Sequence, residues 1–390
     1  MKSIKTYLLL FFTAIGTITQ AQSYNNFYGD IVNNYSSDTV LNHLVEFENL
    51  GVKQHGSPAL QNTLDWLIDK YTGYGYTDIA IDTFNYSAQD DYNLIVTKQG
   101  NLYPNTYVII DGHYDTRSGP GTNDNGSGIA VILEVARLLQ NINTDYSIKF
   151  INFSGEEDGL IGSTNYVNNV VVPTNMDIKI VFNIDEVGGV NGLTNNIIVC
   201  ERDQGIPTIA NAASYAYTDT LANCIELYAN LQTEISYAYS SDYMPFQAQE
   251  KVITGLFEKN QSPHPHTPTD FLSNMDPNYV YEITKGTIGA SLYFACAREF
   301  PAGTKDPAHN NDFYPSIYPN PVQNNLNIDF KKLSYEKQII RITNILGEVV
   351  FEQAATQGKE KISLSLLNSG VYNLSIQSSD NYFSKKIIIQ

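Results

Sequence analysis

Residues 107–139 read YVIIDGHYDTRSGPGTNDNGSGIAVILEVARLL, and this stretch decides the fold. It begins with the apolar run Tyr107–Asp111, which is short and rich in β-branched side chains, as buried strands are. After a glycine-rich turn, Ser127–Leu139 repeats its apolar side chains at helical spacing, so that they share one face. The stretch therefore predicts a buried strand, a polar turn and an amphipathic helix.

The same alternation of strands and helices extends on both sides of this stretch. A long closing helix is expected over Asp276–Phe300. Such alternation over residues 92–300 predicts an α/β sandwich, with a mostly parallel sheet and helices on both faces. Ligands of such sheets bind beyond the carboxyl ends of the strands, so the chemistry is expected there. The other expected strands are Asn93–Thr97, Ile148–Phe153, Ile178–Ile184, Ile197–Cys200 and Val252–Phe257.

Composition argues against two broad classes of protein. The 390 residues carry 23 Lys and Arg against 41 Asp and Glu, a net charge of −18, and a surface this negative would repel nucleic acids. With 42% hydrophobic and only 16% charged residues, the chain is not expected to be disordered. Cys200, Cys224 and Cys296 are too few for a disulfide scaffold, although one bridge is compatible with them.

The first group of polar residues follows the strand Tyr107–Asp111 directly. His113 and Asp115 are two positions apart, so in an extended chain their side chains face the same way. A metal-bound imidazole usually has its second nitrogen held by a carboxylate or a carbonyl, a role that Asp115 fits. A single histidine is more often structural, so this pair predicts a metal site only together with further ligands.

Asp124 lies in the glycine-rich turn just before the helix at 127–139. An aspartate at this place commonly caps the helix, yet a carboxylate in such a turn can also approach a metal pair, and both roles stay open. The glycines do not form a phosphate loop, because the turn contains neither GxGxxG nor Gly-Lys-Ser/Thr.

Three consecutive acids, Glu156, Glu157 and Asp158, follow the expected strand Ile148–Phe153. Acids so close to an apolar core are costly without a cation. Because neighbouring side chains cannot share one geometry, we expect one carboxylate to bind a metal and its neighbour to transfer protons. The alternative is a solvated acidic turn, but the apolar and small residues at 160–163 favour a packed setting.

Two further places offer ligands: Asp185 ends an apolar run, and His264 and His266 lie in a proline-rich loop. Together with His113, Asp124 and Glu157 they give nitrogen and oxygen ligands that suit zinc, with cobalt or manganese as possible substitutes. Five protein ligands exceed the three that a catalytic zinc usually takes, whereas one shared carboxylate would serve two metals. Such a pair generates a bridging hydroxide and polarises a carbonyl, as amide hydrolysis requires.

Taken in order, these motifs resemble the co-catalytic zinc aminopeptidases, a family that includes secreted bacterial leucyl aminopeptidases and is related to glutamate carboxypeptidase. The resemblance covers roughly residues 90–300. It implies the zinc exopeptidase fold, two zinc ions, and peptide substrates with a free N-terminus. It rests on GHYDT at 112–116, NDNGSG at 123–128, FSGEEDGLIGS at 153–163, DEVG at 185–188 and HTPTD at 266–270.

The resemblance also assigns roles to residues. Glu156 would be the general base beside a metal-bridging hydroxide, and Asp115 the partner that orients His113. Of the two loop histidines, His266 is chosen over His264 because the family's ligand precedes a segment of the Thr-Pro-Thr-Asp type. The implied metal ligands are His113 and Asp185 on one zinc, Glu157 and His266 on the other, and Asp124 bridging both.

Two positions depart from the family's pattern. Many relatives have Ser-Asp-His before Pro-Phe, where this chain has SDYMPF at 241–246, and several carry Tyr before the ligand histidine, where this chain has Pro265. If that Tyr assists the transition state in relatives, the assisting group here comes from elsewhere, with Tyr243 a candidate. The departures affect substrate preference and rate rather than the metal site.

Two other functions share this fold. A glutaminyl-cyclase-like acyltransferase typically has Trp before the ligand histidine and one zinc, whereas the only Trp of this chain is Trp66. A non-catalytic receptor-like module, as in the transferrin-receptor branch, would be expected to have lost ligands, and none is missing here. Both therefore rank behind the peptidase.

The ends of the chain are expected to lie outside a catalytic domain at 22–305. Residues 1–21 are predicted to be a secretory signal, with Lys2 and Lys5 before an apolar run and the small Ala21 before the cut. The run is shorter than the roughly 20 residues of a membrane span, so none is expected in the mature protein. Residues 306–315, rich in Pro, Asn and His, are predicted to be a linker.

Residues 316–390 alternate short strands with turns, which predicts a small β-sandwich. They carry 8 basic and 6 acidic side chains, whereas residues 22–315 carry 13 and 35, so the acidity belongs to the larger domain. A carbohydrate-binding or adhesive β-domain would show the same strand pattern.

Four short motifs occur along this module: YPNP at 318–321, ILGE at 345–348, SGVY at 369–372 and KKIII at 385–389. In this order and spacing they resemble the C-terminal sorting domain of Bacteroidetes type IX secretion. The resemblance implies export through the periplasm to a secreted or cell-surface location, with the type IX machinery as a partner.

Overall fold

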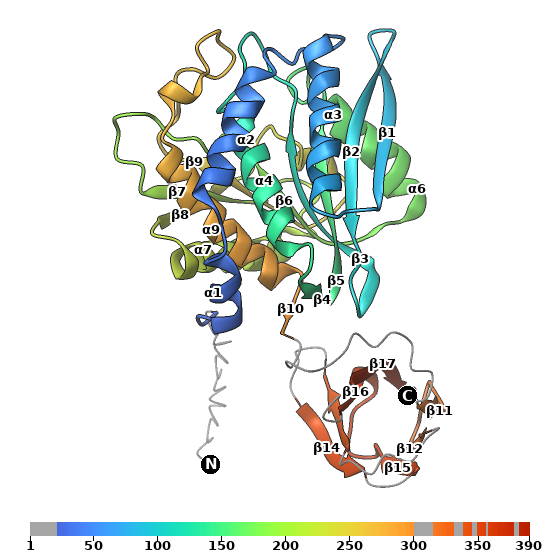
Figure 1. The fold of residues 1–390 in the computed structure, drawn as a ribbon. Helices are drawn as coiled ribbons and strands as arrows, with labels where there is room; N and C mark the ends of the chain where they lie inside the picture. The colour runs from blue at the N-terminus through green and yellow to red at the C-terminus, as the bar shows by residue number, and fades with distance from the viewer. Residues whose placement is uncertain (1–21, 300–314, 331–337, 345–348, 356–357, 378–381) are drawn as a thin grey trace, which may run out of the picture. The chain divides into compact units, whose positions relative to one another are not determined.

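The computed structural model describes residues 22–299, 315–330, 338–344, 349–355, 358–377 and 382–390. It divides the chain into two compact units, Met1–Ala297 and Arg298–Gln390 (Figure 1). The predicted secretory signal at 1–21 and positions 306–314 of the predicted linker lie outside the described residues. Within the described ranges, no helix combines the length and the apolar character that a membrane span requires.

An eight-stranded sheet forms the centre of the first unit, with strands in the order β1-β2-β5-β3-β6-β9-β7-β8. Its four central strands, β5, β3, β6 and β9, run parallel, while β2 and β7 pair antiparallel to them on either side. The strands are β1 Ile79–Tyr86, β2 Gln89–Lys98, β3 Tyr103–His113, β5 Tyr146–Phe153, β6 Asp177–Ile184, β7 Ile197–Arg202, β8 Gln232–Tyr237 and β9 Ile253–Glu258.

Helices cover both faces of this sheet (Figure 1). Val108 and Ile110 of β3 pack on one face with the long helices, whereas Ile109 packs on the other face with Tyr166 and Phe246. The predicted α/β sandwich is therefore confirmed. The helices on the first face are α2 Ser37–Asn49, α3 Pro58–Gly73, α4 Gly126–Leu139, α7 Asn211–Tyr228 and α9 Pro277–Phe294; α1 Asn26–Val32 precedes them. The second face carries α5 Ile161–Tyr166, its continuation Val167–Val171, α6 Val172–Thr174 and α8 Met244–Gln247.

The predicted closing helix is wrong at its C-terminal end. It starts as expected, since Asp276 caps α9 and accepts the backbone N–H of Asn278. It ends at Phe294 rather than at 300, because Cys296 adopts a left-handed φ of 50°. The chain then pairs as β10 (Ala297–Arg298) with β4 (Asn143–Thr144).

The three cysteines form no disulfide. Cys200 and Cys224 are buried free thiols, and Cys296 is a half-buried one. The single bridge that the composition allowed is therefore not formed.

The second unit is an antiparallel β-sandwich, as predicted. Its two sheets have the orders β11-β12-β15 and β14-β13-β16-β17. One core joins them, with Leu326 and Ile328 from the first sheet and Ile342, Leu374 and Ile387 from the second. The strands are β11 Ser316–Tyr318, β12 Asn325–Asp329, β13 Gln338–Thr343, β14 Val349–Ala355, β15 Lys359–Ser363, β16 Gly370–Gln377 and β17 Tyr382–Ile389.

Candidate metal centre

Most of the predicted site residues lie at one edge of the central sheet. His113 is the last residue of β3, and Asp185 follows directly after β6. Glu156 and Glu157 lie in the turn after β5. Because β5, β3 and β6 are parallel neighbours, their carboxyl ends bring together residues that are distant in the sequence.

Asp124 joins these residues from the turn before α4. Helix α4 is capped by Asn125, whose side chain accepts the backbone N–H of Gly128, so Asp124 is not the cap. The N–H of Asp124 donates instead to the carboxylate of Asp270 at 3.0 Å, as does the N–H of Asn123. The carboxylate of Asp124 is therefore left to face the site, where it is only 4% exposed.

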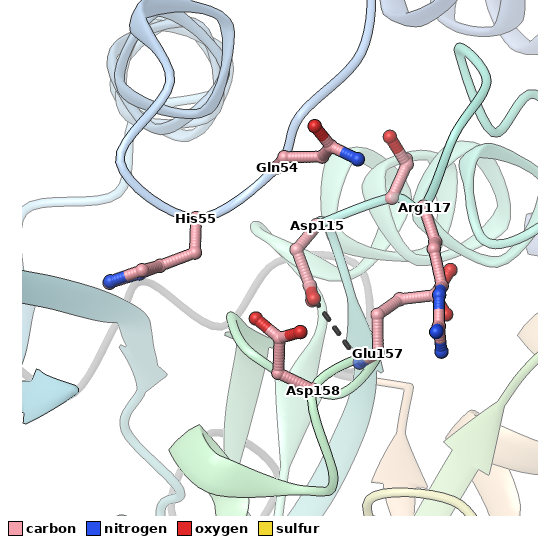
Figure 2. Close-up of a pocket in the computed structure, with 7 residues that line it drawn as sticks. Gln54, His55, Asp115, Arg117, Glu157 and Asp158 are labelled. Atoms are coloured by element: carbon pink, nitrogen blue, oxygen red, sulfur yellow. Dashed lines mark hydrogen bonds between the residues drawn. The ribbon is translucent and has the colours of Figure 1, made fainter. Parts of the chain in front are cut away.

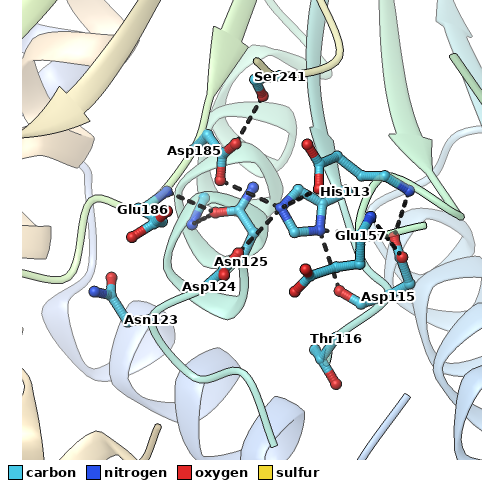
Figure 3. A network of polar contacts seen from close by, with 12 residues as sticks. His113, Asp115, Thr116, Asn123, Asp124, Asn125, Glu157, Asp185, Glu186 and Ser241 are labelled. Carbon is cyan, nitrogen blue, oxygen red and sulfur yellow. Dashed lines mark hydrogen bonds and ion pairs between the residues drawn. The ribbon is translucent and has the colours of Figure 1, made fainter. Parts of the chain in front are cut away.

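The two oxygens of Asp124 face two different histidines. Oδ1 lies 3.2 Å from His113 Nε2, and Oδ2 lies 3.2 Å from His266 Nε2. His113 Nε2 is also 3.3 Å from Asp185 Oδ1 (Figure 3), and His266 Nε2 is 2.7 Å from Glu157 Oε2. Two groups of donors follow, and they share Asp124.

We name them the sheet group, His113, Asp124 and Asp185, and the loop group, Asp124, Glu157 and His266. Within each group, one ligand atom from every residue lies within 4.8 Å of the others. All five side chains that the sequence predicts as metal ligands thus come together. The structure does not bring His264 into either group, because its Nδ1 lies 2.8 Å from Thr269 Oγ1.

These donors fit a pair of divalent ions. Imidazole nitrogens and carboxylate oxygens are the ligands that zinc takes in proteins. Glu157 Oε1 is buried and has no hydrogen-bond partner among the residues that the structure describes, so one acceptor stays unused. A buried polar atom without a partner is costly unless a further group binds it.

Asp115 connects the two groups through its backbone and its side chain (Figure 3). Its carbonyl oxygen lies 3.1 Å from His113 Nδ1, closer than its carboxylate at 3.6 Å. The carboxylate accepts the backbone N–H groups of Glu156 and Glu157, each at 3.2 Å. Asp115 therefore contacts the predicted histidine mainly through its main chain, and its side chain fixes the acidic turn.

Glu156 lies beside the sheet group without belonging to either group. Its Oε2 is 4.0 Å from His113 Nε2, and its side chain is 13% exposed. Burial raises the pKa of its carboxyl to about 10, with the negative charge of Asp185 adding to the rise and the positive charge of His113 opposing it. Cations bound at the two groups would shift this balance towards the carboxylate.

The shared ligand behaves in the opposite way. Burial alone would raise the pKa of Asp124, but hydrogen bonds from His113 and His266 outweigh it and lower the pKa to about 2. Asp124 is therefore a carboxylate at neutral pH. This is the form that binds a metal ion.

The SDYMPF segment supports the sheet group and answers one question left by the sequence. Ser241 Oγ donates to Asp185 Oδ2 at 2.7 Å (Figure 3). Tyr243 is fully buried, and its hydroxyl donates to Glu201 Oε2 at 2.6 Å and accepts the backbone N–H of Tyr239. Tyr243 is therefore engaged inside the protein and is not available to contact a substrate.

Two charged residues near the centre were not predicted to act. Glu186 follows Asp185 with a left-handed φ of 46°, and burial together with the charges of Asp124 and Asp185 raises its pKa to about 10. Arg117 lines a pocket of about 240 Å³ that also borders Glu157 (Figure 2). Glu186 is adjacent to the predicted ligand Asp185, and Arg117 is two positions after Asp115, but only the fold shows that they reach the site.

Comparison with known proteins identifies the family. Residues 93–290, half of the chain, match the model of peptidase family M28, and the chain therefore belongs to this family. Residues 316–390 match the secretion system C-terminal sorting domain. The two resemblances that the motifs indicated are thus confirmed.

The individual relatives and solved structures described next share less than a third of their residues with this chain. The aminopeptidase YwaD of Bacillus subtilis is 28% identical over 221 residues, which are 55% of this chain and 47% of the relative, so the chain spans about half of that protein. The LapA aminopeptidase of Legionella pneumophila superposes with a TM-score of 0.63 at 20% identity, over 76% of this chain and 81% of that chain. The glutaminyl cyclase of Fimbriiglobus ruber gives a TM-score of 0.55 at 16% identity, over 66% and 95%. These structural likenesses show the fold alone.

Proposed function

We propose that this chain is a secreted aminopeptidase with two zinc ions, which removes N-terminal residues from peptides. The observation that carries the proposal is the carboxylate of Asp124, whose two oxygens face two separate groups of imidazole and carboxylate donors. A centre for one ion needs only three protein ligands and no shared one. Membership of peptidase family M28 supports the proposal.

The sheet group would hold one ion and the loop group the other, with Asp124 on both. Zinc fits the donors, with cobalt or manganese as substitutes. Bound there, the ions supply Lewis acidity, which polarises the substrate carbonyl and lowers the pKa of a water molecule towards about 7. Asp115 keeps His113 and the backbone of Glu157 in place for this binding.

Glu156 is the residue that moves the proton. Its carboxylate takes a proton from the attacking water as the new C–O bond forms, and returns it to the amide nitrogen as the C–N bond breaks. Glu156 is free for this role because it belongs to neither donor group. The carboxylate of Asp115 accepts its backbone N–H and so fixes its position.

The acidic surroundings favour a substrate with a free α-ammonium group. Glu186 follows Asp185 and adds a carboxyl group that neither donor group uses, and cations bound at the two groups would favour its charged form. An ammonium ion is attracted to such a place, and acetylation of the N-terminus removes the positive charge. The chain should therefore cut unblocked peptides and spare blocked ones.

Hydrolysis of unblocked and N-acetylated aminoacyl anilides tests this proposal, with the bound zinc counted in the same preparation. We expect two zinc ions per chain and release of the anilide from the unblocked substrates only. Equal rates on both kinds of substrate would contradict an aminopeptidase. Loss of activity with a chelator and its return with zinc would complete the test.

A glutaminyl-cyclase-like acyltransferase is the second candidate, because the cyclase of Fimbriiglobus ruber shares the fold. Pro265 precedes His266 here, and Trp66 lies on α3, where its indole N–H donates to Glu46. The same assays separate the candidates. Cyclised glutamine together with one bound zinc would establish the cyclase. If the chain forms no product and binds no metal, it is a receptor-like module.

We further propose that residues 1–21 act as a secretory signal. Residues 316–390, joined to the domain at 22–305 by the linker at 306–315, would direct that domain through the type IX machinery. The match of residues 316–390 to a sorting domain supports this. Deleting these residues in a host with type IX secretion should leave the enzyme in the periplasm. Export of the shortened chain to the surface or the medium would contradict the proposal.

A further inference from the structure

A polar pocket borders the loop group and has no role in the mechanism above. Its volume is about 240 Å³, and Asp115 and Glu157 of the centre form part of its wall (Figure 2). This is smaller than the roughly 300–1,000 Å³ of pockets that enclose drug-sized ligands. The pocket suits one amino-acid residue of a bound peptide rather than a long segment.

Arg117 is the cation that this pocket offers to a ligand. Its side chain is exposed, and it makes no hydrogen bond or ion pair with any residue that the structure describes. It lies near the centre, because it lines the same pocket as Glu157 of the loop group. An unpaired guanidinium offers a fork of donors that matches a carboxylate.

The other basic side chain of the wall is already occupied. His55 Nδ1 lies 2.9 Å from Asp91 Oδ2, and its Nε2 lies 3.0 Å from the carbonyl oxygen of Tyr86. Both partners are acceptors, so His55 has no nitrogen left for a ligand. Arg117 is therefore the charged donor that remains.

Acids dominate the rest of the domain, where residues 22–315 carry 35 acidic and 13 basic side chains. Glu186 adds a carboxyl group beside Asp185 of the sheet group, whereas the pocket beside the loop group holds Arg117. Three acids also line this pocket: Asp115, whose carboxylate accepts two backbone N–H groups, Glu157 of the loop group, and the exposed Asp158. The site thus has an acidic end and an end with a free cation. A short peptide has the matching charges, an ammonium group at its start and a carboxylate at its end.

We propose that Arg117 and this pocket bind a carboxylate carried by the residue that follows the scissile bond. The inference rests on the aminopeptidase function proposed above and makes that function more specific. Two sources could supply the carboxylate: the free C-terminus of a dipeptide, or an acidic side chain in a longer peptide. The pocket is the site where the leaving residue is recognised.

A series of substrates separates the sources. Leu-Ala, Leu-Ala-amide, Leu-Glu-amide and Leu-Ala-Ala differ in whether, and where, the leaving side carries a carboxylate. We expect kcat/KM for Leu-Ala to exceed that for Leu-Ala-amide about tenfold, as one charge-assisted pair allows. If Leu-Glu-amide exceeds Leu-Ala-amide instead, the side chain is the source and the proposal still holds. Equal values for all four substrates would overturn it.

Two substitutions in the same pocket should act in opposite directions. Arg117→Gln should abolish the preference for Leu-Ala over Leu-Ala-amide. Asp158 also lines the pocket and is exposed, so Asp158→Asn removes a repelling charge and should increase the preference. General damage to the pocket would instead reduce the preference for Leu-Ala over Leu-Ala-amide in both variants. The matched control is Lys259→Gln, which removes a positive charge whose partner is Glu234, outside the pocket, and should leave the ratio unchanged.

A binding measurement keeps this test independent of turnover. In the Glu156→Gln variant, calorimetry should show tighter binding of Leu-Ala than of Leu-Ala-amide, and the added substitution Arg117→Gln should remove the difference. Equal binding of both peptides would overturn the inference even if the enzyme is an aminopeptidase. If the peptides bind with the expected difference but the native chain cuts none of them, the proposed function fails and the carboxylate site stands.

Discussion

The two donor groups that share Asp124 are built in different ways. In the sheet group, His113 ends a central strand and its side chain is 1% exposed, while Ser241 Oγ donates a hydrogen bond to Asp185. In the loop group, His266 lies in a loop, adopts a left-handed φ of 57°, and is 54% exposed. The two groups thus differ in their histidines, one buried at the end of a strand and the other on an exposed loop, whereas the side chain of Glu157 is no more exposed than that of Asp185.

This difference shows how the fold divides its tasks. A buried ligand held by strands is preorganised, because packing and hydrogen bonds fix its rotamer before a metal binds. A ligand on an exposed loop leaves room for the substrate, and the pocket with Arg117 opens on that side. We therefore expect substitutions in the sheet group to affect folding and metal binding, and those in the loop group to affect metal and substrate binding.

The largest effect should come from Glu156→Gln, which removes the proton carrier and no ligand. We expect kcat to fall by about 10²–10⁴-fold while both ions stay bound. The neighbouring Glu157→Gln should instead lose the ion of the loop group. Metal analysis and kinetics of the two variants measure this contrast, and loss of zinc from Glu156→Gln would place Glu156 among the ligands.

The next effect compares the two histidines in protein freed of metal by a chelator. His113→Ala should lower the free energy of unfolding by about 1–3 kcal/mol, because the buried Asp124 and the half-buried Asp185 lose a partner that lies inside the protein. His266→Ala also removes a partner of two carboxylates, Asp124 and Glu157, but it should lower the free energy of unfolding by less, because the His266 side chain is 54% exposed and water screens its contacts. Urea unfolding of both variants gives the two values. Equal destabilisation would show that the groups do not differ in this way.

Asp115→Asn should weaken zinc binding at both groups. Its carbonyl contacts His113 and its carboxylate holds the N–H groups of the acidic turn, so the substitution disturbs the turn that carries Glu157. Partners of metal ligands typically contribute 10–100-fold to affinity, and we expect about tenfold here because the carbonyl contact remains. Competition with a zinc-binding dye measures the two affinities. Unchanged affinities would contradict the role given to this carboxylate.

The smallest effect should come from Ser241→Ala, which removes one hydrogen bond to Asp185. A loss of about 1 kcal/mol corresponds to roughly fivefold weaker binding of the sheet-group ion, with the loop-group ion unaffected. The same dye titration resolves the two steps. A fivefold change in zinc affinity confined to the loop group would contradict the assignment of Ser241 to the sheet group.

How much of the site the sequence predicts depends on the kind of residue. His113 and Asp185 could be predicted because each follows an apolar strand, and parallel strands end at one edge. Asp124 could not be separated from a helix cap by spacing, and His266 was chosen over His264 through the family resemblance alone. The structure decides both questions, the role of Asp124 and the choice between His266 and His264. It does so through contacts between residues that are distant in the sequence, such as that of Asp270 with the backbone of Asp124.

Other features could not be predicted because they depend on tertiary packing. The end of α9 at Phe294 follows from the pairing of β10 with β4, which no local pattern indicates. The burial of Tyr243 against Glu201 and the pocket around Arg117 arise in the same way. Of these features, the pocket is the one on which the proposed substrate preference depends.

The most direct test of the account is a crystal structure of the zinc-loaded enzyme with anomalous scattering measured at the zinc edge. We predict two anomalous peaks about 3.5–4 Å apart, with Asp124 between them, His113 and Asp185 on one and Glu157 and His266 on the other. A single peak, or a second peak held by other side chains, would contradict the shared-carboxylate centre on which the proposed function rests.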